Sequence, residues 1–162
     1  MLLLLVLLYQ FILTFLPNGD MLVTERPGRV RYVSADGKVS RPLRGAPKAF
    51  ASGQGGMLDI AVAPDFSSSR EVYISYSERR SSGGAGTTVA RMKLQGAGSA
   101  ARLTDMKIIF RQKPAYSGGR HYGSRIVFAP DGKMLITLGD RGNARHAQNL
   151  KQHLGKVIRL SR

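Results

Sequence analysis

Three segments of the chain share one pattern, and this repetition constrains the fold more than any other feature. They read "TFLPNGDMLVTER" at 14–26, "AVAPDFSSSREVYISYSE" at 61–78 and "VFAPDGKMLITLGDRG" at 127–142. Each has an apolar strand that ends at a proline, then a polar turn, then a second strand. The proline follows the strand, where its missing N–H costs little hydrogen bonding. Because Asn-Gly and Asp-Gly dipeptides suit tight turns, the pattern predicts recurring β-hairpins.

The spacing of these hairpins predicts propeller blades. The prolines that mark the three repeats stand 47 and 66 residues apart, and repeats of about 40–50 residues built from hairpins are typical of four-stranded blades. We therefore expect an all-β chain that forms a partial propeller of about two and a half antiparallel blades. Their expected bounds are 12–50, 51–112 and 113–162, the last blade being incomplete.

The expected strands follow from the same reading. They lie at 12–15, 21–26, 29–34, 57–63, 71–78, 87–94, 105–112, 124–129, 134–140 and 156–160. The stretch "GNARHAQNLKQHLG" before the last strand reads as a loop with one helical turn. Two and a half blades do not close a ring, and open blades leave strand edges exposed. The chain is therefore expected to be part of a longer protein or to need partners.

The N-terminus, residues 1–11, is an apolar leader. A signal peptide normally has a basic first region and a cleavage site of small residues, but no Lys or Arg precedes Arg26. The apolar stretch of residues 1–16 is also shorter than the ~20 residues of a membrane-spanning helix. Three interpretations stay open: an imperfect export signal, a membrane-proximal segment, or a wrong start of the reading frame.

Charge and composition narrow the function classes. The chain has 25 Lys and Arg against 10 Asp and Glu, a balance that favours anionic partners. The arginines are spread along the chain, without the compact basic helix or interleaved aromatics of a nucleic-acid binder. We therefore expect a solvated basic surface and no nucleic-acid partner. The absence of cysteine excludes disulfides and thiolate chemistry, and no P-loop or dinucleotide fingerprint occurs.

Two strand entrances, the loops that directly precede a strand, are candidate catalytic or binding sites. Gln54 lies among glycines before the strand at 57, and His121 lies among glycines before the strand at 124. Aligning the two repeats on their prolines sets Gln54 opposite Arg120, beside His121. Ligand sites gather on such loops, and a neutral histidine there accepts a proton from a substrate hydroxyl. The alternative for His121 is a loop histidine that hydrogen-bonds a carbonyl. The alternative for Gln54 is an amide that stabilises the turn.

Three further polar residues need an interpretation. Asp140 ends a strand, so it either accepts backbone N–H bonds in the turn or contacts a ligand on the active face. His146 and His153 are seven residues apart, which would place them on one helical face. Because no carboxylate or cysteine lies at matching spacing, we expect solvent-exposed loop histidines rather than a metal pair. The ligands of any metal are not predicted.

Five ordered blocks carry a family resemblance across residues 12–160. They are "LPNGDMLVTERPGRVRYV", "GQGGMLDIAVAPDF", "VYISYSE", "GGRHYGSRIVFAPDGKMLITLGDRG" and "AQNLKQHLGKVIRL". Together they resemble the glucose/sorbosone dehydrogenase family, which comprises aldose sugar dehydrogenases that depend on pyrroloquinoline quinone. The resemblance implies a six-bladed β-propeller, of which this chain would supply the first part.

The resemblance also implies a reaction. Members oxidise the C1 hydroxyl of aldoses to lactones by hydride transfer to the quinone, with calcium as an activating ion. His121 then corresponds to the general base, and Gln54 to a residue lining the substrate and cofactor pocket. Arg120 and Asp140 are assigned contact roles in the same pocket.

Other expectations concern the setting of this reaction. The resemblance implies an external electron acceptor and a periplasmic or secreted location. Because most cofactor contacts of the family lie in later blades, the 162-residue chain alone is expected to be inactive. The alternative function is a propeller that binds a ligand without catalysis.

Overall fold

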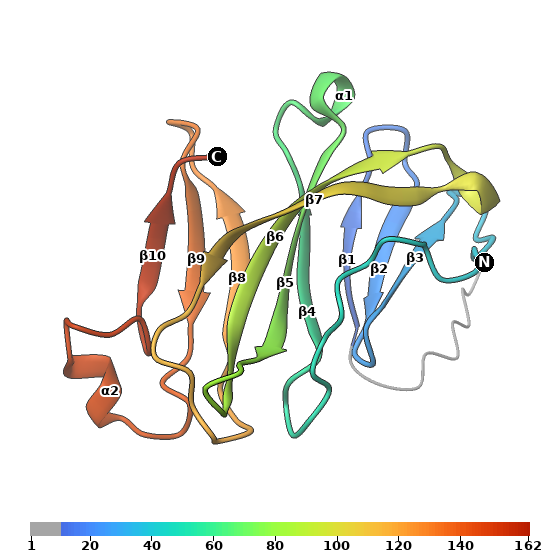
Figure 1. Ribbon diagram of the computed structural model, residues 1–162. Helices are drawn as coiled ribbons and strands as arrows, with labels where there is room; N and C mark the ends of the chain where they lie inside the picture. Colours follow the sequence, from blue (N-terminus) through green and yellow to red (C-terminus); the bar gives the residue numbers. More distant parts are fainter. Residues whose placement is uncertain (1–10) are drawn as a thin grey trace.

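The computed structural model describes residues 11–162, which form three antiparallel sheets standing side by side (Figure 1). The first sheet has the order β1-β2-β3. Its strands are β1 (Phe11–Phe15), β2 (Met21–Glu25) and β3 (Arg29–Val33). An irregular segment with turns then leads to the second sheet.

The second sheet is a four-stranded blade and the third has three strands. The second has the order β4-β5-β6-β7 and the third the order β10-β9-β8. The strands of the second sheet are β4 (Met57–Val62), β5 (Glu71–Arg79), β6 (Ala85–Gln95) and β7 (Arg102–Arg111); the helix α1 (Phe66–Ser69) connects β4 to β5, and the 3-10 helix η1 (Gly98–Ala100) connects β6 to β7. The strands of the third sheet are β8 (Gly123–Phe128), β9 (Met134–Leu138) and β10 (Val157–Leu160), and the helix α2 (Arg145–Gln148) lies between β9 and β10. The prediction of an all-β partial propeller is confirmed, and α2 supplies the expected helical turn.

The repeated turns explain why the hairpins recur. After β1, the N–H of Gly19 donates to the carbonyl of Leu16 at 3.0 Å, and after β8 the N–H of Gly132 donates to Ala129 at 2.9 Å. Both glycines have positive φ, at 84° and 79°, a conformation that residues with a Cβ rarely adopt. The two local sequences therefore close their hairpins in the same way.

Two hydrophobic cores lie between the sheets. One combines residues of the first and second blades, and the other combines residues of the second and third. The long β6–β7 hairpin reaches across the first blade (Figure 1), where Leu103 is buried and its N–H donates to the carbonyl of Arg44 at 2.9 Å. Burial of this tip explains why β6 and β7 extend beyond the expected strands at 87–94 and 105–112.

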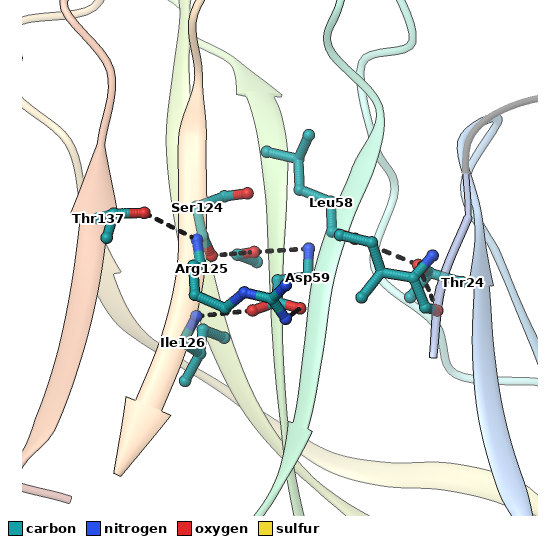
Figure 2. Close-up of polar contacts among 9 residues, drawn as sticks. Thr24, Leu58, Asp59, Ser124, Arg125, Ile126 and Thr137 are labelled. Atoms are coloured by element: carbon teal, nitrogen blue, oxygen red, sulfur yellow. Dashed lines mark hydrogen bonds and ion pairs between the residues drawn. The ribbon is translucent and has the colours of Figure 1, made fainter. Parts of the chain in front are cut away.

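Strands β1, β4 and β8 are the edge strands through which the three sheets meet. Hydrogen bonds cross both junctions (Figure 2). The Thr24 hydroxyl donates to the carbonyl of Leu58 at 3.2 Å, which links the first blade to the second. The Ile126 N–H donates to the carboxylate of Asp59 at 2.6 Å, which links the second blade to the third. The second of these bonds sets the start of β4 beside that of β8.

The leader expected at residues 1–11 lies outside the described residues except for Phe11, the first residue of β1. Within residues 11–162, no helix has the length and apolar character needed to cross a membrane.

Candidate functional site

The loops that precede β4 and β8 meet through Gln54. Its side-chain oxygen Oε1 accepts the N–H of His121 at 2.8 Å, and its own N–H donates to the carbonyl of Gly119 at 2.8 Å. Gln54 and His121 are 67 residues apart in the chain. The structure therefore brings together the two strand entrances that the repeat alignment set opposite each other.

Asp140, on the loop after β9, holds the His121 ring. Its Oδ1 lies 2.8 Å from Nδ1 of His121 and accepts the N–H of Gly142 at 2.8 Å. The Gly142 N–H and then the His121 ring lower the pKa of Asp140, so the carboxylate is ionised at neutral pH. An ionised carboxylate favours the tautomer whose proton is on Nδ1. Nε2 then carries the lone pair.

The backbone of His121 is in the left-handed region, with φ of 48°. This conformation is costly for a residue with a Cβ and persists where the surroundings enforce it. Gly139 allows the close approach that this requires, because a Cβ there would lie 1.9 Å from the carbonyl oxygen of His121. The local strain and the tight packing together give the histidine one defined position.

A cavity of about 400 Å³ lies beside the histidine. Its lining combines β1, β4 and the entrance of β8 and consists of Ile12, Gln54, Met57, Leu58, His121, Tyr122, Gly123 and Ser124. This volume falls within the range of about 300–1,000 Å³ that small-molecule sites occupy. The His121 side chain is 53% exposed, so its ring is accessible from this cavity.

Arg120 differs from the other predicted site residues. It is exposed and does not line the cavity, and its main-chain carbonyl accepts a hydrogen bond from Nε of Arg141 at 2.8 Å. Asp140 likewise lies outside the cavity lining and acts through the His121 ring. The structure therefore brings Gln54 and His121 to the cavity and places Asp140 behind them.

Sequence reasoning missed Arg141, a residue of the "GDRG" turn. It is buried, with 2% of its surface exposed, and its guanidinium lies 3.5 Å from the centre of the Tyr122 ring. A charged residue in a polar turn is normally solvated, so nothing in the local sequence signals this burial.

The expectation of solvent-exposed histidines at 146 and 153 is wrong. Both are half-buried, because the segment around α2 folds back onto the end of β7 and the loop after it. The N–H of Lys113 donates to Nδ1 of His153 at 3.0 Å, and the His153 ring packs on Phe110. The His146 ring packs edge-on against Tyr116. These histidines are packing residues.

No metal centre is formed by the described part of the chain. Within residues 11–162, no three His, Cys, Asp or Glu side chains are grouped so that they could hold an ion.

Comparison with known proteins identifies relatives of this chain. A family model described as Glucose / Sorbosone dehydrogenase matches residues 8–162. Aldose sugar dehydrogenase YliI of Escherichia coli (strain K12) is 42% identical over 154 residues, which are 94% of this chain and 41% of the relative. An uncharacterized protein of Synechocystis sp. is 40% identical over 167 residues, covering 92% of this chain and 39% of that protein. The chain thus spans about 40% of the length of these curated relatives.

Solved structures give the same result. The soluble aldose sugar dehydrogenase of Escherichia coli in its apo-form matches with a TM-score of 0.89 and 42% identity, over 96% of this chain and 44% of that structure. The PQQ-bound form of aldose sugar dehydrogenase from Streptomyces coelicolor matches with a TM-score of 0.80 and 29% identity, over 94% and 44%. The family match spans nearly all of the sequence, and the resemblance expected from the five blocks is confirmed: the chain belongs to the glucose/sorbosone dehydrogenase family.

Proposed function

We propose that the protein carrying this chain oxidises the C1 hydroxyl of aldose sugars to lactones, with His121 as the general base. The observation that carries the proposal is the hydrogen bond of 2.8 Å between His121 Nδ1 and Asp140, beside a cavity of about 400 Å³. Family membership supports the reaction class, and relatives named as aldose sugar dehydrogenases support a sugar substrate.

The proton transfer follows from the ring's hydrogen bonds. The Asp140 carboxylate accepts a hydrogen bond from the Nδ1–H of His121, so the lone pair of Nε2 is available to take the proton of the sugar hydroxyl. As the hydroxyl loses its proton, departure of the hydride from C1 becomes easier. The Asp140 carboxylate then stabilises the imidazolium that forms, as a buried carboxylate does for the histidine of a hydrolase triad.

The residues around the cavity fit one side of a quinone cofactor. Ile12, Met57 and Leu58 provide apolar surface, and Gln54 and His121 provide polar groups, the combination that small-molecule sites use for orientation. Pyrroloquinoline quinone, when bound, would supply the hydride acceptor. The existence of a relative in PQQ-bound form supports this choice.

Calcium is part of the expectation but receives no role in this reaction scheme. Residues 11–162 gather no group of acidic or histidine side chains that could bind it.

The 162-residue chain alone is proposed to be inactive, because the aldose sugar dehydrogenase relative is more than twice as long as the segment it shares with this chain. The test compares the chain with a longer product, made by extending it with the genomic sequence downstream of codon 162. Both are incubated with pyrroloquinoline quinone and calcium, and glucose-dependent dye reduction is measured.

Three results separate the alternatives. Turnover by the longer product that falls by about 10²–10⁴ in a His121→Ala variant supports the proposal and the base role. Turnover that survives this substitution at a near wild-type rate excludes His121 as the base. Quinone binding without oxidation of any aldose instead supports the second candidate, a propeller that binds without catalysis.

The setting of the reaction is part of the proposal. We place the protein in the periplasm or outside the cell, where it would pass electrons to an external acceptor. The location is the one that the family resemblance implies, and an imperfect export signal is one of the three interpretations of residues 1–11. Fractionation of the source cells, with the protein detected by antibody, tests this; recovery in the cytoplasm alone would overturn it.

A further inference from the structure

Arg141 makes an unusual set of contacts for an arginine in a turn. Its Nε donates to the carbonyl of Arg120 at 2.8 Å and its Nη1 donates to the carbonyl of Ala85 at 3.0 Å. Its Nη2 donates to the carbonyl of Gly118. One side chain therefore ties the start of β6 to two peptide groups of the loop that carries His121.

The charge of Arg141 is buried without a carboxylate. Among residues 11–162 no Asp or Glu forms an ion pair with it, and burial lowers its pKa while Tyr122 opposes that shift. Burying an unpaired cation is unfavourable. Three carbonyl oxygens and the face of the Tyr122 ring, 3.5 Å away, offset this cost. An apolar side chain would fill the same space without that cost, so packing alone does not explain the arginine.

The contacts of Arg141 lie on both sides of the histidine. Arg120, whose carbonyl it binds, precedes His121, and Tyr122, whose ring it covers, follows it. His121 has φ of 48°, a conformation that must be enforced by its neighbours. Asp140, next to Arg141 in sequence, holds the imidazole ring at the same time.

We propose that Arg141 is a positioning residue for His121. Through the Arg120 carbonyl and the Tyr122 ring, it holds His121 in its left-handed conformation, in which Nδ1 meets Asp140. This inference rests on the proposed function only in assigning His121 as the base.

The test uses the longer product described above, without cofactor or sugar, so its result does not depend on the proposed reaction. NMR gives two signatures of His121: the intraresidue HN–Hα NOE, which is stronger at positive φ because the two protons lie closer together, and the ring ¹⁵N shifts, which report the tautomer. In Arg141→Met we expect this NOE to weaken to that of a residue with negative φ and the ring shifts to move toward a mixture of tautomers. A folded Arg141→Met chain with wild-type signatures would overturn the proposal.

Two further variants keep the test decisive. Arg141→Lys retains the charge but lacks the planar fork that reaches three carbonyls, so partial changes are expected. If the Met variant does not fold, the Lys variant decides in the same way. Arg145→Met, at an exposed position in α2, is the matched control and should leave both signatures unchanged. An equal change in this control would assign the effect to lost charge and overturn the proposal.

Steady-state kinetics of the quinone-loaded longer product test the positioning role of Arg141 independently. A displaced base should lower kcat on the order of tenfold or more, with little change in KM for the sugar. A loss confined to KM would contradict a positioning role. If the wild-type product oxidises no sugar, the proposed function fails, whereas the NMR result still decides the role of Arg141.

Discussion

His121 Nδ1 lies 2.8 Å from Oδ1 of Asp140, and that same oxygen accepts the N–H of Gly142 at 2.8 Å. The carboxylate therefore connects the histidine ring to the backbone of its own turn. Because the ring is hydrogen-bonded to this carboxylate, the loop after β9 helps to orient the His121 side chain. Five predictions concern this site and the junction between the second and third blades.

Asp140→Asn should change how stability depends on acid. The Gly142 N–H and the His121 ring lower the pKa of Asp140 in the folded chain. Its stabilising contribution is thus present above the pKa of the unfolded chain and lost as pH falls through the folded pKa. The variant should have a lower Tm at neutral pH and a shallower fall of Tm in acid. Thermal unfolding followed by circular dichroism measures this, with the exposed Asp105→Asn as control; parallel curves for wild type and Asp140→Asn would contradict it.

Asp59 should show the opposite pH dependence. Burial raises its pKa, although the Ile126 N–H and Arg125 oppose the shift. Its contribution is therefore fully present below the unfolded pKa and is lost as pH rises through the folded pKa. In Asp59→Asn, this loss should disappear from the curve of Tm against pH.

The Asp59 carboxylate also holds the second blade to the third. In Asp59→Ala, the buried Ile126 N–H loses its partner, which should cost about 1–3 kcal/mol in free energy of unfolding. Denaturant unfolding measures that cost. An alanine variant as stable as wild type would show that the inter-blade bond contributes nothing.

Gly139→Ala should disrupt the histidine loop. A Cβ at this position would lie 1.9 Å from the His121 carbonyl oxygen, and overpacking of this kind costs about 1–3 kcal/mol. Gly119→Ala is the matched control in the same site, because the nearest atom to its Cβ, the Gly53 Cα, is 3.5 Å away. Denaturant unfolding of both variants should show a loss for Gly139→Ala alone; equal losses would mean that the contact is not limiting.

Gln54→Ala should expose the backbone of His121. The amide oxygen of Gln54 accepts the His121 N–H at 2.8 Å, so its removal should speed hydrogen exchange at that amide. Gln54→Glu keeps an acceptor oxygen at the same distance along the side chain and should preserve the protection. Exchange measured by NMR compares the two, and equal protection in the alanine variant would show that another group holds this N–H.

Much of the fold was predictable because its signals are local. Proline at a strand end and Asn-Gly or Asp-Gly in the next turn act through the backbone of a few residues, and Gly19 and Gly132 adopt the positive φ that those turns require. The strands around them, β2, β5 and β9, appear where expected. The length of β6 and β7 was underestimated because their tip is stabilised by the first blade, which is distant in sequence.

The site divides in the same way. Local sequence was enough to identify the strand entrances with Gln54 and His121, and the five blocks were enough to indicate the family. Contacts between blades decided the rest: the Gln54–His121 bond spans 67 residues, and Arg141 is buried although its turn reads as polar. Periodicity describes which face of a strand is apolar, but it does not encode which loops meet when sheets pack. The pairing of His121 with Asp140 follows from the register of the β8–β9 hairpin, in which Gly123 pairs with Leu138. The Gln54–His121 bond and the contact of Arg141 with Ala85 of β6 arise only when the blades stand side by side.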